Sequence, residues 1–456
     1  MDDPDENLPV PDDDDWDGDG LPDFSGLPEQ MRQFLDANGN LDVNKLMGGL
    51  KAALGQAMSG SDPTSGLNWN STAQNAAKLV AASGDDPVPP RTPSEVTDAF
   101  GLANRWLDNA MTFPGDTLRL ELWNRARWVE QTMPAWRSMC GPIVVSLGDA
   151  LIAMASQGLG DGAPPELKSL TDMMTPMMRS TAGQFYATRL AKSIADLATT
   201  TLSGTDAALP MVSPPVVALL PGNITAFTKD LTAPATDTLV YLLARECARQ
   251  RLFTATPWLG PQILALIEHY AREITIDPNA LREGFDIENM TEMTPQRLAD
   301  ISAQMEDRIF RPATTDEQKA ILTRLETLVC LVEGWVDTVV GQAAGQWLAS
   351  AAALAETMQR RRAAQGPAER TLNSLVGIQL GSRRVRDAAN LWAAVDHDRG
   401  LAARDALWGH PDLLPQADDL DDVMGFVART GADAKPDAMD AQLNWLVDQW
   451  RKDNEG

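Results

Sequence analysis

Residues 239–253 form a largely apolar, helix-forming stretch, and three of its charged side chains, Arg245, Glu246 and Arg249, stand at positions i, i+1 and i+4. In the zinc-binding pattern H-E-x-x-H, the residues at i and i+4 are histidines. They lie on one helix face and bind the metal, while the glutamate at i+1 is the general base for the attacking water. A guanidinium offers no lone pair and stays protonated in proteins. The two arginines therefore cannot bind zinc, and only the base position, Glu246, is kept.

A second pair of charged residues with the same spacing follows further along the chain. Glu333 and Asp337 lie at i and i+4 of another helical stretch, so both carboxylates fall on one helix face. If the two faces pack together, two guanidinium groups meet two carboxylates, and arginine can bind a carboxylate through two parallel hydrogen bonds. We expect this cluster to join the helices in place of a metal ion. The open alternative is that Arg245 and Arg249 reach solvent and pair locally.

The order of these motifs, followed by Arg360 to Arg362 and by the segment 404–415, resembles a family of mainly actinobacterial proteins described as zinc-dependent metalloproteases. The resemblance covers residues 90–430 and implies a helical, zincin-like fold. It also implies that Glu246 stands at the general base and Glu333 at the third zinc ligand. Arg245 and Arg249 then stand at the two histidine ligands, where the chain departs from the family's pattern.

Taken together, the motifs predict a degenerate zinc metallopeptidase homologue, without metal, without catalysis and without a cofactor, that acts through binding. Its protein partner cannot be identified from the sequence. One open alternative is an active zinc-dependent metalloprotease with an unrecognised metal site, in which Glu246 is the base for peptide hydrolysis. The other is a structural partner protein that docks through an acidic arm or through the Met-rich stretch 173–178.

Other site chemistries find less support in the sequence. His269, His397 and His410 are isolated, so none forms a local pair of metal ligands. The three cysteines lie in apolar helical patterns, and we expect buried, reduced thiols rather than disulfides. The run Arg360 to Arg362 closes a helix before Gly366, which is typical of compensation of the helix dipole.

Charge and hydropathy restrict the partners and the location. A formal net charge of −26 excludes nucleic acid as the expected partner and disfavours anionic membrane surfaces. The longest apolar stretch, 141–154, is shorter than the ~20 residues that a membrane helix needs. The chain opens with acidic residues and shows no basic, apolar leader. We therefore expect a cytoplasmic protein without membrane insertion.

The composition predicts a mainly α fold with at most a short edge β segment at 209–220, preceded by a disordered acidic arm. The resemblance implies that the helical core is zincin-like. We expect three parts: an arm and linker with short helices over 1–90, a helical metallopeptidase-type domain over 91–435, and a C-terminal helix and tail over 436–456. Within the domain, Pro134 is expected to separate helices at 116–133 and 135–157.

Within the arm, the residues from Asp15 to Asp23 have the spacing of a calcium loop. They lack a glutamate at the twelfth position, where Gly26 stands. A plain acidic tail is the favoured interpretation, and calcium binding stays open.

Overall fold

A computed structural model describes residues 60–89, 91–159, 165–206, 209–272, 315–363, 366–378 and 384–430. They belong to one compact unit, Gly60–Gly456. The acidic arm with its calcium-like loop and the expected C-terminal helix lie outside the described residues. Residues 173 and 174 of the Met-rich stretch lie in helix α6 (Pro165–Ala198), and only their backbone is described. No helix in the described part of the chain is long and apolar enough to cross a membrane.

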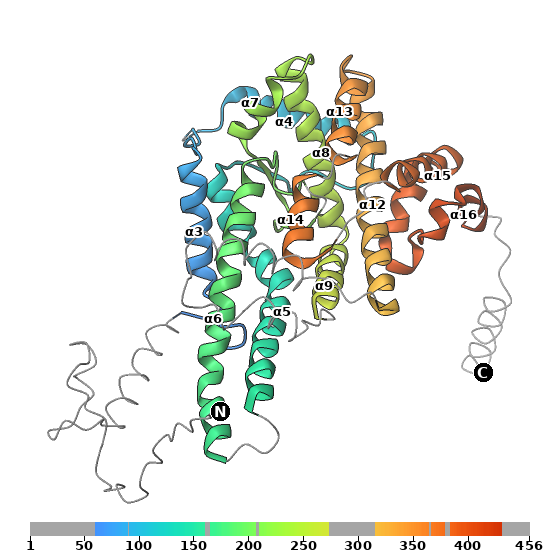
Figure 1. Cartoon of the computed structure of the whole chain (residues 1–456). Coiled ribbons are helices and arrows are strands. Elements are labelled where there is room, and N and C mark those ends of the chain that lie inside the picture. The colour runs from blue at the N-terminus through green and yellow to red at the C-terminus, as the bar shows by residue number, and fades with distance from the viewer. Residues whose placement is uncertain are drawn as a thin grey trace, which may run out of the picture. The chain divides into compact units, whose positions relative to one another are not determined.

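The unit is mainly helical, which confirms the predicted fold class. Figure 1 shows α5 and α6 running side by side along their length, with α3 beside α6, and with α15 and α16 beyond α12. The helix α3 lies within the segment expected to be a linker, and it packs against α5 and α6. The described helices are α3 (Trp69–Ala82), α4 (Ser94–Leu107), α5 (Arg125–Leu159), α6 (Pro165–Ala198), α7 (Pro221–Thr228), α8 (Ala235–Ala255), α9 (Leu259–Arg272), α12 (Asp316–Gly345), α13 (Ala351–Ala363), α14 (Pro367–Val376), α15 (Val385–Ala406) and α16 (Val423–Arg429).

The long helix α5 corrects the expected break at Pro134. The helix runs through both Pro134 and Pro142, although each proline removes one backbone hydrogen bond. Trp128 and Trp136, on either side of Pro134, are both buried in the core. Packing of this kind contributes more to helix stability than local propensity does, and it holds the helix together across the prolines.

A small parallel sheet lies beside the central helices. Its strands are β1 (Arg119–Leu122) and β2 (Val216–Leu219), paired from Arg119 opposite Val216 to Leu122 opposite Leu219. The strand β2 falls inside the expected β segment, after its last proline, Pro215. The strand β1 replaces the start of the helix expected at 116–133. Its four residues include Leu and Glu, which favour helices, so only pairing with β2 gives them their extended form.

The helix α8 is central, because it packs against α4, α12 and β2. Every residue from Val240 to Phe253 is buried, which is typical of a helix in the middle of a core. Its neighbour α12 begins at the cap of Thr315, whose side chain accepts a hydrogen bond from Gln318 N. On α12, a side chain at Gly334 would come within 2.6 Å of the Ala389 backbone nitrogen. Glycine therefore lets α15 approach closely beside Glu333.

Candidate functional site

The facing sides of α8 and α12 carry a buried cluster of ion pairs. Arg245 Nη2 lies 2.7 Å from Glu333 Oε2, and Arg245 Nη1 lies 2.5 Å from Asp337 Oδ1. Arg249 Nε donates to Glu333 Oε1 at 2.7 Å, and its Nη2 lies 2.7 Å from the same oxygen. The structure thus brings together the two arginines and two carboxylates whose i, i+4 spacings match in the sequence. Neither arginine reaches solvent, and the local pairing is present only as a longer contact of 3.6 Å between Arg249 Nη1 and Glu246 Oε2.

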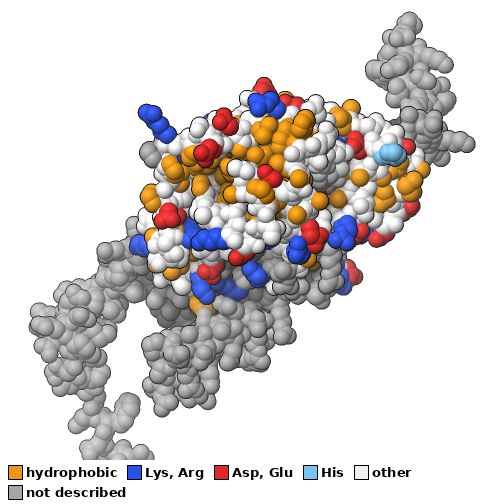
Figure 2. Space-filling model, turned by 90° about the horizontal axis from the view of Figure 1, so that it is seen from above, with side chains coloured by type: hydrophobic (Ala, Val, Ile, Leu, Met, Phe, Trp, Pro, Cys, Tyr) orange, Lys and Arg blue, Asp and Glu red, His pale blue; other side chains and the backbone are white. Residues whose placement is uncertain are grey.

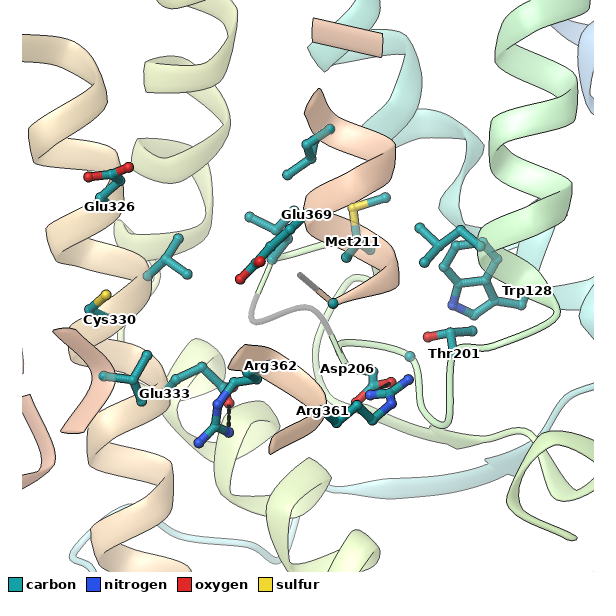
Figure 3. Close-up of a pocket in the computed structure, with 18 of the residues that line it drawn as sticks. Trp128, Thr201, Asp206, Met211, Glu326, Cys330, Glu333, Arg361, Arg362 and Glu369 are labelled. Atoms are coloured by element: carbon teal, nitrogen blue, oxygen red, sulfur yellow. Dashed lines mark hydrogen bonds and ion pairs between the residues drawn. The ribbon is translucent and has the colours of Figure 1, made fainter. Parts of the chain in front are cut away.

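A third arginine, Arg362 from α13, completes the cluster. Its Nη1 donates to Glu333 Oε2 at 2.8 Å and its Nη2 donates to Asp337 Oδ2 at 2.5 Å. Figure 3 shows Arg362 turned toward Glu333 across the end of α13. The preceding Arg361 binds Asp206 and the Thr200 carbonyl oxygen, both at 2.8 Å. The run stands in the last turn of α13, as the expectation of dipole compensation requires, and Arg361 and Arg362 also bind groups on other elements.

Because the cluster is buried, the interactions between its charges are screened little by solvent. The side chains of Arg245 and Arg249 are each 2% exposed and that of Glu333 is 4% exposed. Burial alone would raise the pKa of Glu333, but the guanidinium groups of Arg249, Arg245 and Arg362 lower that pKa well below its usual range. Burial also acts to lower the pKa of Arg245, and Asp337 and Glu333 more than offset it, so the pKa rises. Both partners are therefore charged at neutral pH.

Glu246, for which the resemblance implies the general base, directly follows Arg245 on α8 and faces the loop of residues 203–205. It is fully buried and accepts hydrogen bonds from Ser203 Oγ at 2.7 Å, Thr205 Oγ1 at 2.8 Å and Gln250 Nε2 at 3.2 Å. Burial raises its pKa, despite the opposing effects of Arg249 and of these donors. The loop beside β2 thus encloses the carboxylate, which in this conformation ties residues 203–205 to α8.

The side chains of the cluster do not form a set of ligands that fits a zinc ion. Zinc needs three or four protein ligands with free lone pairs, whereas the cluster offers two carboxylates held by three guanidinium groups. Both oxygens of Glu333 and of Asp337 accept hydrogen bonds or ion pairs from arginine. Across the described ranges, no three His, Cys, Asp or Glu side chains come together in a way that can hold a metal ion.

The remaining candidate groups lie elsewhere. His269 is half exposed beside Glu317, and His410 Nδ1 accepts a hydrogen bond from the Asp412 backbone as part of a turn. All three cysteines are buried and lie outside any disulfide, as expected. Burial raises the pKa of Cys140 and Cys330 to about 12, so neither thiol is nucleophilic at neutral pH.

A pocket of about 930 Å³, part of it open to solvent, lies next to the cluster. Glu333, Arg361 and Arg362 form part of its wall, and the opposite wall comes from α5 and from the loops around β2. The cluster therefore closes one side of a cavity instead of facing bulk water.

Comparisons with known proteins assign the fold. The sequence profile of a family described as zincin-like metallopeptidase matches residues 67–427. A crystal structure from Chloroflexus aurantiacus, described as a "putative hydrolase with a novel fold", is similar with a TM-score of 0.50 and 16% identity, and the match covers 80% of this chain and 99% of that one. That likeness concerns the fold alone. No curated protein matches the chain. Because the family profile spans most of its length, the chain belongs to the zincin-like metallopeptidase family.

Proposed function

We propose that this member of the zincin-like metallopeptidase family binds no catalytic metal, does not hydrolyse peptides and acts by binding another molecule. The observation that carries the proposal is the cluster itself. Arg245 and Arg249 stand where the resemblance places two metal ligands, and both donate to Glu333, the residue in the position of the third ligand. An ion pair thus takes the position that a metal would occupy, and the family's scaffold is kept.

The position of Glu246 supports the same proposal. A general base must reach the proton of a water molecule or substrate, but the Glu246 carboxylate is fully buried and accepts from Ser203, Thr205 and Gln250. These donors hold the 203–205 loop closed over it. Opening the loop would leave a buried carboxylate without its hydrogen bonds, which is costly.

A binding role has support at the surface. Figure 2 shows many apolar side chains on the face that carries the ends of α4, α7 and α13. Trp347, which follows α12, is 64% exposed and stacks on Trp106 with ring centroids 6.3 Å apart. Exposed apolar groups that gather in this way mark contact surfaces. The buried, reduced cysteines fit a cytoplasmic setting.

The test is peptide hydrolysis with and without added zinc. The wild-type chain is expected to cleave no peptide in a mixed peptide library at any zinc concentration. The matched variant carries Arg245→His, Arg249→His and Arg362→Gln, which restores two imidazoles and frees Glu333. This variant should gain zinc affinity by at least ~100-fold, because three ligands replace a cationic site.

The outcome that overturns the proposal is zinc-dependent cleavage by the wild-type chain that a chelator abolishes. Cleavage that disappears with Glu246→Gln would further restore Glu246 as the base and establish the alternative, an active metalloprotease. A zinc-binding but inactive triple variant would agree with the enclosed position of Glu246.

A further inference from the structure

Within the described ranges, the small sheet of β1 and β2 has one edge that no further strand covers. In a pair of strands, every second residue hydrogen-bonds to the neighbour, and the residues between them turn their backbone groups to the other side. The backbone nitrogens of Arg119 and Trp123 donate at 3.0 and 2.9 Å to carbonyl oxygens at and beside β2. The N–H and C=O groups of Leu120 and Leu122 therefore point away from β2.

The opposite edge of the sheet is already occupied. Residues 202 and 204, in the loop that encloses Glu246, pair with the other side of β2 through two backbone hydrogen bonds of 3.1 and 3.0 Å. On β1, no hydrogen bond from the described part of the chain reaches the outward backbone groups of Leu120 and Leu122. Both residues are only half-buried, and their side chains pack against the core. A fixed strand edge of this kind is a template for a further strand.

A cleft of about 600 Å³, open to solvent, lies against the carboxyl end of β1. Its walls also come from the start of α5 and from Pro87 and Val88, which precede α4. Pro87 has no N–H and cannot donate to a strand edge. The polar side chains of the cleft are engaged, because Trp123 Nε1 donates to Glu121 Oε2 at 2.8 Å and Arg127 pairs with a glutamate of its own helix. An uncharged, apolar side chain therefore fits this cleft better than a charged one.

We propose that the outer edge of β1 binds an extended peptide segment of a partner protein, which adds to the sheet as a third strand. Its backbone exchanges hydrogen bonds with the N–H and C=O groups of Leu120 and Leu122, and one uncharged, apolar side chain enters the cleft beside Val88. In this mode of recognition, main-chain hydrogen bonds supply affinity and pockets for alternate side chains supply selectivity. The inference rests on the proposed binding function and names the chemistry of the partner.

The experiment follows the backbone amides of Leu120 and Leu122 in the full chain labelled with ¹⁵N-leucine. Their resonances are assigned with Leu120→Ile and Leu122→Ile. The probes are three blocked peptides, Ac-Ser-X-Thr-X-Ser-NH2, in which both X residues are Val, Ile or Phe. At least one peptide should move both resonances downfield in a saturable way and slow their hydrogen exchange by at least ~10-fold, because pairing protects an amide from exchange.

Two N-methylated forms of the tightest peptide test whether its backbone makes the contact. One form is methylated on both X nitrogens, and the other on the nitrogens of Thr and of the second Ser. Alternate residues of a strand direct their N–H groups to opposite edges. One form should therefore bind about 30-fold more weakly, the equivalent of two net hydrogen bonds, and the other should bind as the parent peptide does.

A matched pair of protein variants tests the cleft. Val88→Lys places a charge in the cleft and leaves the strand untouched, so it should weaken peptide binding about tenfold, as the loss of one buried apolar contact does. Leu79→Lys is the control. Leu79 lies on α3, is 45% exposed and does not line the cleft, so its replacement should leave the affinity unchanged.

The inference is overturned if no peptide moves the two amides, if both N-methylated forms bind alike, or if Leu79→Lys weakens binding as much as Val88→Lys does. Analytical ultracentrifugation without peptide tests a different occupant. A dimer whose formation protects the same two amides would assign the edge to a second copy of this chain and overturn the inference too. Zinc-dependent cleavage of peptides by the wild-type chain would overturn the proposed function, whereas the amide titration is read independently of hydrolysis.

Discussion

Glu333 is the carboxylate on which the cluster depends, so Glu333→Gln is the most informative single change. The substitution keeps the shape of the side chain and removes its charge. In the native structure the two oxygens accept hydrogen bonds from Arg249 Nε, Arg245 Nη2 and Arg362 Nη1. The amide nitrogen of glutamine cannot accept any of them. At least one buried guanidinium is then left facing another donor.

The expected loss follows from the burial of these partners. A hydrogen bond to a charged group contributes about 1.5–3 kcal/mol, and breaking a buried ion pair by removing one partner costs about 3–5 kcal/mol. Since Arg245 and Arg249 are 2% exposed and Arg362 is 17% exposed, solvent screens little of this loss. We expect the free energy of unfolding of Glu333→Gln to fall by about 3–5 kcal/mol at pH 7.

Urea unfolding of the full chain measures this loss in free energy. Glu246→Gln is the control, because it replaces a glutamate that is equally buried but whose pKa is shifted in the opposite direction. The pKa of Glu246 is raised, whereas that of Glu333 is lowered. A group with a lowered pKa stabilises the fold above its unfolded pKa, here about 4.5, and this contribution is lost as the pH falls toward the folded value. The gap between wild type and Glu333→Gln should therefore narrow below pH ~4.5. A loss under ~1 kcal/mol at pH 7, or a gap that widens in acid, would refute the reasoning.

Three further predictions concern other parts of the chain. Because the pKa of Glu246 is raised in the folded state, its protonated form stabilises the fold below pH ~4.5, and this contribution is lost as the pH rises. The free energy of unfolding of Glu246→Gln should therefore improve relative to that of wild type between pH ~4 and pH ~7. A decline over this range would contradict the raised pKa. Deleting residues 1–25 should leave the melting temperature unchanged with and without calcium, and calcium stabilisation of the intact chain alone would establish the loop from Asp15 to Asp23 as a site. Cys140 and Cys330 should resist alkylation at pH 8 until the chain unfolds, since burial raises both pKa values to about 12; rapid labelling of the native chain would show that they are accessible.

The four central residues of the cluster were predictable because their positions on the helix faces follow from spacing within short sequence segments. Two residue pairs at i, i+4 spacing place Arg245 with Arg249, and Glu333 with Asp337, on single helix faces, and the family resemblance supplies the reason for the faces to meet. Arg362 was not predictable, since it follows α12 on a separate helix and only tertiary packing brings it to Glu333. Because residues 360, 361 and 362 are all arginines, the sequence does not show that Arg362 is the one that points toward Glu333.

The enclosure of Glu246 was missed for a similar reason. Its hydrogen-bond donors Ser203 and Thr205 come from a loop that β2 holds in place through the hydrogen bond from Gly204 N to Ala218 O. The strand β1, which pairs with β2, has a helix-favouring composition and becomes a strand only through this pairing. At Pro134 the sequence predicted a break between two helices, whereas α5 continues through it. A buried helix tolerates a proline that an isolated helix would not.

The central claim is that guanidinium groups stand in the place of a metal ion. Zinc content of the full chain, purified without chelator and loaded with excess zinc before gel filtration, tests this claim most directly. The account predicts far less than one zinc per chain for the wild type and about one per chain for the variant with Arg245→His, Arg249→His and Arg362→Gln. About one zinc per wild-type chain, lost on Glu333→Ala, would contradict it.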